Sequence, residues 1–218
     1  MIRVLYEPAR SGLAAARRVL LLPPAYARAE DFLSAGFVAA VRERALDLDV
    51  ALVEPQFESV TDRGALDELD ALIGAARREG CTELWLGGIS LGAYLALGCA
   101  ERQPGALEGL CLFAPYLGSH LITGEIERAG GLEAWEPGEI APADEERRIW
   151  RFLKRHGHGT PPIHLGLGRD DRYRARHETL ARALGAQRVE WVPGGHEWPV
   201  WRRLWEGFLD VRINPATG

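Results

Sequence analysis

The stretch that decides the fold runs from Thr82 to Arg102, TELWLGGISLGAYLALGCAER. Its centre, residues 88–92, spells G-x-S-x-G with Ser90 in the middle. The apolar run at 84–86 is typical of a buried strand, and the apolar residues within 91–99 recur at helical spacing. A G-x-S-x-G motif between a strand and a helix predicts a nucleophile elbow, in which a serine is held on a sharp turn with its hydroxyl exposed.

Short apolar runs and amphipathic stretches alternate on both sides of this motif. The runs predict strands at residues 2–6, 19–22, 50–53, 84–89, 110–113, 163–167 and 189–192. The amphipathic stretches predict helices at 30–46, 66–76, 91–103, 144–155 and 173–184, with a last helix ending near 208. This alternation indicates an α/β fold, a three-layer sandwich with a mainly parallel central sheet of about seven strands and a short N-terminal edge.

The whole chain, residues 1–218, is predicted to form a single domain, because its length suits one substantial core. The pattern loosens between residues 117 and 160, and we expect this excursion to form a small cap or lid above the strand ends. Asp62 is a candidate N-cap for the helix that follows it. Arg17 and Arg18 are assigned to a polar loop, and the tail after Asp210 is expected to be disordered.

Composition argues against several classes of partner. The formal net charge is −5, so the chain lacks the basic surface that nucleic acid or an anionic membrane would need. No apolar run approaches the length of a membrane span, and the first residues do not resemble a secretory leader. We therefore expect a soluble, cytoplasmic protein. The cysteines at positions 81, 99 and 111 lie far apart and are expected to be buried free thiols.

Candidate catalytic residues follow three of the predicted strands. A serine hydroxyl needs a base within hydrogen-bond reach and a third group that orients the base. His196 follows the last predicted strand, and Asp170 and Asp171 follow the strand before it. The carboxyl ends of parallel strands meet at one edge of a sheet, where active sites gather, so these residues are expected to lie near Ser90.

Taken together and in this order, GGISLGAY, GRDDRY and GGHEW resemble the α/β-hydrolase superfamily over nearly the whole chain. The resemblance implies Ser90 as nucleophile, His196 as general base and then acid, and an aspartate that holds the imidazole. The family often has G-x-x-D after the penultimate strand, which favours Asp171 and leaves Asp170 as the alternative. It also implies that the backbone N–H of Leu91 is one donor of an oxyanion hole.

The second oxyanion donor is expected from the loop after the strand at 19–22. Two prolines open this loop, and proline has no N–H, so Ala25 is the first available donor and Tyr26 the second. Many relatives have His-Gly-x here, so this chain departs from their pattern. Tyr26 and Trp198 are possible walls of a substrate pocket, whereas Tyr116 is assigned to ordinary loop packing.

These features predict a serine hydrolase that cleaves a small-molecule carboxylic ester or thioester through an acyl-enzyme. The same triad could instead support acyl transfer or hydrolysis of a peptide, lactone or carbon–carbon bond, and the fold could survive as a non-catalytic binding domain. No cofactor or metal is expected: His156, His158 and His164 are interpreted as solvated or satisfied, and His177 as half of a surface pair with Glu178. The sequence leaves the acyl group, the leaving group and the oligomeric state open.

Overall fold

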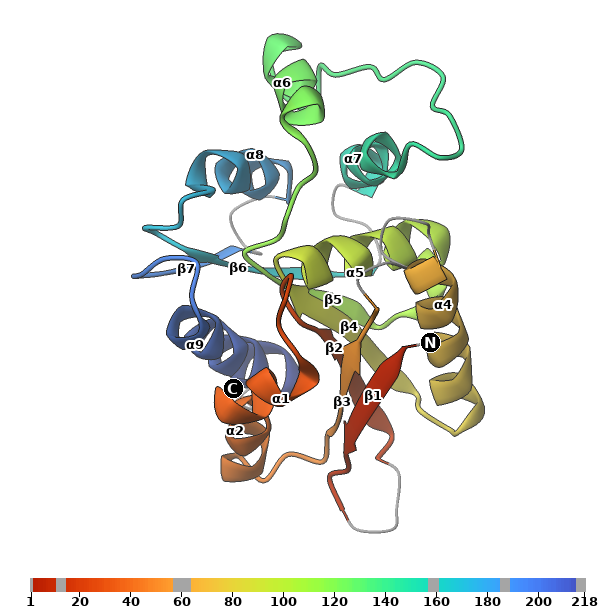
Figure 1. The fold of residues 1–218 in the computed structure, drawn as a ribbon, viewed down its shortest axis with the longest axis vertical. Helices are drawn as coiled ribbons and strands as arrows, with labels where there is room; N and C mark the ends of the chain where they lie inside the picture. Colours follow the sequence, from red (N-terminus) through yellow and green to blue (C-terminus); the bar gives the residue numbers. More distant parts are fainter. Residues whose placement is uncertain (1, 11–14, 57–63, 157–160, 185–188, 215–218) are drawn as a thin grey trace.

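A computed structural model describes residues 2–10, 15–56, 64–156, 161–184 and 189–214 of the chain (Figure 1). Asp62 and His158 lie outside the described residues, as does the side chain of His156. The strands are β1 (Arg3–Glu7), β2 (Arg17–Leu22), β3 (Asp49–Glu54), β4 (Glu83–Ile89), β5 (Gly109–Phe113), β6 (Ile163–Gly168) and β7 (Val189–Val192). The helices are α1 (Ala29–Ser34), α2 (Phe37–Glu43), α4 (Gly64–Arg78), α5 (Leu91–Arg102), α6 (His120–Arg128), α7 (Glu145–His156), α8 (Arg174–Leu184) and α9 (Trp198–Phe208).

The strands form one seven-stranded sheet in the order β1-β3-β2-β4-β5-β6-β7. Only β1 runs antiparallel to its neighbour, β3, and the other pairs are parallel. The mainly parallel sheet and the short N-terminal edge that the sequence predicts are therefore confirmed. Because the parallel strands end at the same edge, the loops that follow β2, β4, β5, β6 and β7 gather there.

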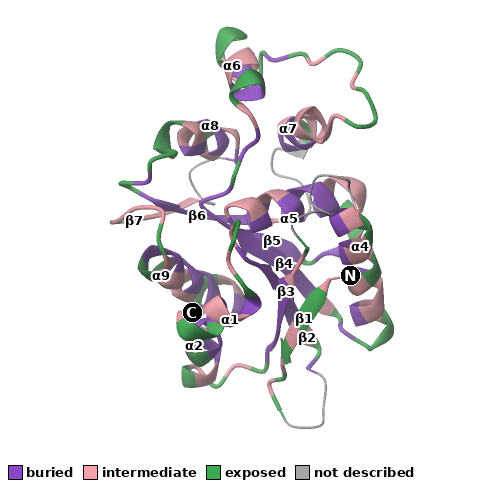
Figure 2. Cartoon of the chain, in the orientation of Figure 1, coloured by how far each residue is buried: buried purple, intermediate pink, exposed green. Residues whose placement is uncertain are grey.

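Two hydrophobic layers cover the sheet because side chains alternate along each strand. In β2, Val19 and Leu21 pack with α1, α2 and α9, whereas Leu20 and Leu22 pack with α4, α5, α7 and α8. Figure 1 shows these helix groups on opposite faces, and Figure 2 shows the central strands buried. The predicted three-layer sandwich is confirmed.

The prediction of one continuous helix over residues 30–46 is wrong, because the structure has two short helices there, α1 and α2. Gly36 between them has φ +81°, a left-handed conformation that ends α1 and turns the chain into α2. The guanidinium of Arg202 in α9 hydrogen-bonds to the Gly36 carbonyl and holds the break. Phe32 and Phe37 are still fully buried, so the apolar stripe indicates the correct face.

The predicted disordered tail is also wrong where the structure describes it. The chain continues from α9 into a turn of π-helix at Leu209–Ile213, in which Ile213 is buried. Arg17 donates a hydrogen bond to the Ile213 carbonyl (2.9 Å) and ties this turn to β2. The packing of Ile213 and this tie explain why a polar-looking tail is ordered.

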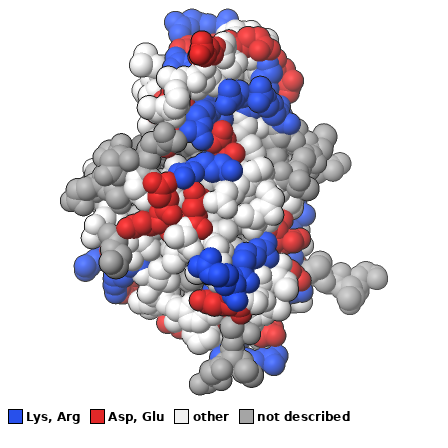
Figure 3. Space-filling model, turned by 90° about the vertical axis from the view of Figure 1, so that its right-hand side faces the viewer, with Lys and Arg blue, Asp and Glu red and all other residues white. Residues whose placement is uncertain are grey.

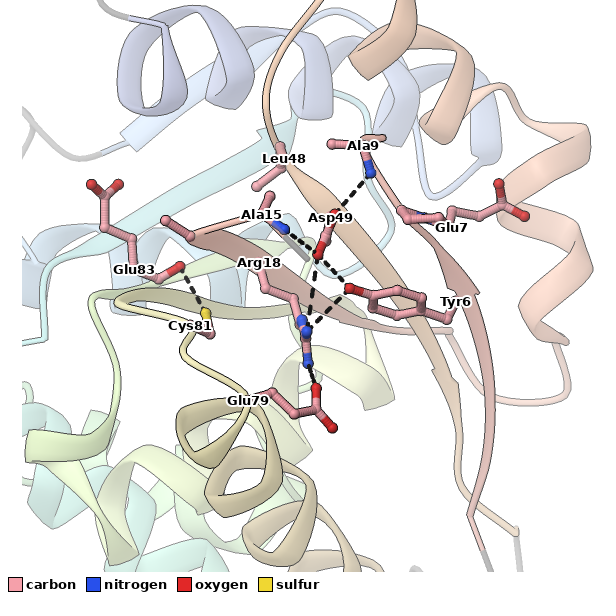
Figure 4. Close-up of polar contacts among 12 residues, drawn as sticks. Tyr6, Glu7, Ala9, Ala15, Arg18, Leu48, Asp49, Glu79, Cys81 and Glu83 are labelled. Atoms are coloured by element: carbon pink, nitrogen blue, oxygen red, sulfur yellow. Dashed lines mark hydrogen bonds and ion pairs between the residues drawn. The ribbon is translucent and has the colours of Figure 1, made fainter. Parts of the chain in front are cut away.

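Arg17 and Arg18 belong to β2 rather than to a loop, and Arg18 is buried in a polar cluster beneath the sheet edge (Figure 4). Its guanidinium donates to Glu79, which directly follows α4 (2.7 Å), and to the Tyr6 hydroxyl of β1 (3.1 Å). Asp49, which is fully buried, bonds to the same hydroxyl and accepts from the Ala15 amide (2.9 Å). Burial, together with the Asp49 carboxylate, raises the pKa of Tyr6 to about 12. The cluster joins β1, β2, β3 and α4.

The segment 117–160 contributes α6 and α7, and the first of these was not predicted. Ile126 of α6 and Trp150 of α7 are buried in the same hydrophobic layer as α5. The Trp150 indole donates to the Leu117 carbonyl (3.0 Å), which fastens α7 to the chain leaving β5. The described part of this excursion is therefore packed onto the main core.

All three cysteines are buried and free, as the sequence predicts. Burial raises the pKa of the Cys99 and Cys111 thiols, which keeps them protonated. Basic and acidic side chains are interspersed over the face drawn in Figure 3. Among the described residues, none of the helices combines the length and the apolar character required to cross a bilayer.

Candidate active site

Ser90 lies at the bend between β4 and α5, beyond the buried end of the strand. Its φ of +52° and ψ of −110° are strained for a residue with a side chain. A Cβ on Gly88 would lie 2.5 Å from the carbonyl carbon of Gly92, and one on Gly92 would lie 2.6 Å from that of Leu22. Both glycines are therefore required by close backbone approach.

His196 and Asp171 contact each other at the edge where the strands end. The His196 Nδ1 atom lies 2.8 Å from Asp171 Oδ2, and Asp171 Oδ1 accepts the Tyr173 N–H at 2.8 Å. A carboxylate can only accept, so Nδ1 carries the proton and Nε2 is the basic nitrogen. Burial opposes ionisation of Asp171, but the hydrogen bonds from His196 and Tyr173 outweigh it and lower the pKa of this carboxyl.

Asp170, the alternative acid, contacts a different group. Its Oδ2 accepts the Gly194 N–H (3.0 Å), and its own N–H donates to the Gly194 carbonyl (3.0 Å). Asp170 is exposed, whereas the Asp171 side chain has no exposed surface. Asp170 thus braces the loop that carries His196, while Asp171 contacts the imidazole itself.

Aromatic rings hold the imidazole of His196 on two sides. The Tyr173 and Trp201 rings meet it edge to face at centroid distances of 5.3 and 5.0 Å. Trp201 in turn packs against Trp198 at 5.3 Å, and Trp198 against Phe32 at 5.4 Å. Packing of this kind restricts rotation of the imidazole ring. It also covers most of the His196 side chain, of which 11% is exposed.

Ser90 and His196 line one cavity of about 1030 Å³. Its wall also includes the other residues predicted for the site, which are Ala25, Tyr26, Leu91 and Trp198. Asp171 does not line the cavity and lies behind the imidazole. No described residue between 117 and 156 lines it either, so the expected cap remains a prediction.

Two backbone amides in this wall have no partner in the described chain. Neither Ala25 N–H, after the two prolines, nor Leu91 N–H, at the first position of α5, donates a hydrogen bond there. Amides at a helix N-terminus favour negative charge on a ligand. The next residue, Tyr26, also lines the cavity, is 89% exposed and has φ +65°, which is strained for a residue with a side chain.

Sequence reasoning missed part of the wall. Tyr116, Tyr173 and Trp201 line the cavity, although loop packing or helix spacing was the expectation for them. Tyr116 lines the cavity rather than packing within its loop, because its N–H bonds to the Ser90 carbonyl (2.9 Å) and brings the ring beside the serine. No local pattern signals such a contact, because it joins two strand ends.

The interpretation of His177 as a surface residue is wrong. It lies in the first turn of α8 and has no exposed surface, because it packs between the Asp171 loop and the chain after β5. Burial lowers its pKa, so the ring is neutral near pH 7. Across the described chain, no three side chains of His, Cys, Asp or Glu are grouped so that they could hold a metal ion.

No protein-family model and no curated protein matches the sequence. The structure is similar to the S-formylglutathione hydrolase of Staphylococcus aureus, at 10% identity and a TM-score of 0.67, over 98% of this chain and 97% of that one. It is also similar to Est1E from Butyrivibrio proteoclasticus (13%, 0.66, 95% and 93%) and to the monoacylglycerol lipase of Paleococcus ferrophilus (14%, 0.62, 96% and 98%). These likenesses confirm that the chain has the α/β-hydrolase fold.

Proposed function

We propose that this protein is a serine hydrolase that cleaves a carboxylic ester or thioester through an acyl-enzyme, with Ser90, His196 and Asp171 as its triad. The observation that carries the proposal is the cavity that Ser90 shares with His196, an imidazole whose Nδ1 is bonded to a buried carboxylate. The names of the similar solved structures, which include a hydrolase and a lipase, agree with this reaction class.

The proposed reaction assigns one role to each group. Ser90 Oγ attacks the carbonyl carbon while Nε2 of His196 takes the hydroxyl proton, and Asp171 stabilises the resulting imidazolium. The carbonyl oxygen becomes an oxyanion that accepts hydrogen bonds from the N–H groups of Leu91 and Ala25. Nε2 then gives its proton to the leaving alcohol or thiol. Water, deprotonated by the same nitrogen, releases the acid and regenerates Ser90.

The wall of the cavity favours a bulky acyl group, because aromatic surface lies beside the charged side chains of Asp31, Arg172 and Glu197. Tyr26, Tyr116, Tyr173, Trp198 and Trp201 supply aromatic surface, and a volume of about 1030 Å³ exceeds what a formyl or acetyl group would fill. We therefore expect kcat/KM to rise along a p-nitrophenyl ester series from acetate to longer or aryl acyl groups.

The decisive experiment combines turnover with labelling by a fluorophosphonate probe. The wild type should hydrolyse p-nitrophenyl esters or acyl-thioesters, and mass spectrometry should locate the label on Ser90. Ser90→Ala should abolish both, whereas Ser34→Ala is the matched control, because Ser34 is an exposed serine whose hydroxyl bonds to the Glu30 carbonyl of its own helix. A folded wild type that neither turns over esters nor reacts with the probe would favour a binding domain.

A further inference from the structure

His177 is a buried imidazole with a single hydrogen-bond partner in the described chain. Its Nε2 atom lies 3.1 Å from the Pro115 carbonyl oxygen. A carbonyl only accepts, so the neutral ring carries its proton on Nε2 and donates it. Nδ1 is left without a partner in the described interior, and the titratable groups that act electrostatically on the ring are Asp171, His196 and Arg176. The hydrogen bond to the Pro115 carbonyl is therefore the one described polar contact that holds the buried His177 ring in place.

The partner of His177 belongs to a strained segment. Ala114 follows β5 with φ +43°, a left-handed conformation that is strained for a residue with a Cβ. Bonds on either side of Pro115 hold the segment: Ala114 N–H donates to the Gly166 carbonyl (2.9 Å), and Tyr116 N–H to the Ser90 carbonyl (2.9 Å). His177 supplies the third restraint, between these two.

The 113–116 segment holds the bend at Ser90 through hydrogen bonds to both the N–H and the carbonyl of Ser90. Ser90 N–H donates to the Phe113 carbonyl (3.0 Å), and the Ser90 carbonyl accepts from Tyr116. The φ of Ser90, +52°, is strained as well, so two strained turns support each other through these bonds. α8 carries His177 and begins directly after the Asp171 loop. The imidazole therefore joins the carboxylate side of the site to the serine side.

We infer that His177 is a positioning residue for the proposed reaction. Its Nε2–H holds the 113–116 segment, and through that segment it sets the direction of the Ser90 hydroxyl toward His196 and of the Tyr116 ring in the cavity wall. The inference rests on the proposed function. It predicts that the donor on residue 177 matters for the rate of the chemical step rather than for the fold.

The test compares His177→Gln with His177→Met. The amide nitrogen of glutamine reaches the position of imidazole Nε2 and keeps a donor, whereas methionine has a similar length and no donor. Each variant leaves one buried oxygen without a partner, the side-chain oxygen of the glutamine or the Pro115 carbonyl oxygen, so both should be less stable than wild type by similar amounts. We expect His177→Met to lower kcat about 10- to 100-fold with little change in KM, since misplacement of reacting groups by about 1 Å can cost a hundredfold. His177→Gln should retain most of kcat despite its lower Tm.

The two variants differ in the donor rather than in the number of unpaired buried groups, so a difference in kcat between them reports on the donor. Values of kcat that follow Tm, or a His177→Met variant with wild-type kcat, would overturn the positioning role. A wild type without ester turnover would instead count against the proposed function. If either single variant fails to fold, the pair is compared in an Ala114→Gly background, because glycine adopts the left-handed conformation without strain. There the folded His177→Met double variant should still have a lower kcat than the His177→Gln double variant, and equal kcat values would also overturn the role.

Discussion

Replacing Asp171 with asparagine should disable the imidazole while leaving its position intact. Asp171 Oδ1 accepts the Tyr173 N–H, so an asparagine at 171 must keep its oxygen there and turn its NH2 toward His196. That NH2 donates to Nδ1, which moves the ring proton to Nε2, the nitrogen that should accept the proton of Ser90. The same substitution in a serine protease lowers kcat about 10⁴-fold, equivalent to about 5 kcal/mol of transition-state stabilisation.

The assay is hydrolysis of a p-nitrophenyl ester by purified Asp171→Asn, with a thermal melt to show that the variant is folded. Asp170→Asn is the matched control: Asp170 is the same residue type one position away, but it bonds to the Gly194 amide instead of the imidazole. We expect the control to stay within about tenfold of wild type, since only the brace of the loop is weakened. A kcat/KM for Asp171→Asn within tenfold of wild type, or a larger loss in the control, would refute the assignment of the acid.

Three further predictions concern stability. Gly92→Ala places a Cβ 2.6 Å from the Leu22 carbonyl carbon and should cost about 1 to 3 kcal/mol of unfolding free energy, measured by urea titration. Gly105→Ala is the control and should cost less than about 0.5 kcal/mol, because a Cβ added there meets no described atom within 4 Å beyond its chain neighbours. Equal losses in the two variants would contradict the close-approach argument. Trp205→Ala should cost about 3 to 5 kcal/mol, because a fully buried indole is lost, and a loss below about 1 kcal/mol would show that the α9 interface repacks. Burial lowers the pKa of His177 below 6.5, so below that pH the unfolded chain binds a proton that the folded chain does not, and wild type loses stability. The stability advantage of wild type over His177→Gln should therefore narrow as pH falls from 7 toward 5, and a constant difference would count against a buried neutral ring.

The sheet could be predicted because its information is local. Each central strand is a continuous apolar run, and the runs begin and end within about two residues of the observed strands. The elbow was equally readable, since both glycines are demanded by backbone contacts within a short stretch and the strand beside it. The loops that carry the aspartates and His196 followed from the rule that parallel strands end at one edge.

The features that sequence reasoning missed depend on contacts between distant segments. The break at Gly36 interrupts an apolar stripe that continues on both sides, and Arg202 holds it from the other end of the chain. Arg18 looked like a loop residue because its partners, Asp49 and Glu79, belong to other elements. His177 sits beside Glu178 in the sequence, but a carbonyl 62 positions away accounts for its burial.

Asp170 and Asp171 show the limit most clearly. They are identical side chains in adjacent positions, so composition treats them alike, and only the resemblance to the G-x-x-D pattern favours Asp171. The turn after β6 directs Asp171 toward the imidazole and Asp170 toward Gly194. A backbone direction, rather than a residue type, decides which carboxylate meets the ring.

The order of strands in the sheet also sets an order of assembly during synthesis. β4 and β5 are synthesised before β7, which lies at the far edge, and before the loop that carries His196, roughly a hundred residues after Ser90. At about 5 to 20 residues per second, a ribosome needs on the order of 5 to 20 s to cover that distance. The segment that holds Ser90 is thus synthesised well before His196. The proposed nucleophile and base can therefore act together only after the last strand and its loop have been made.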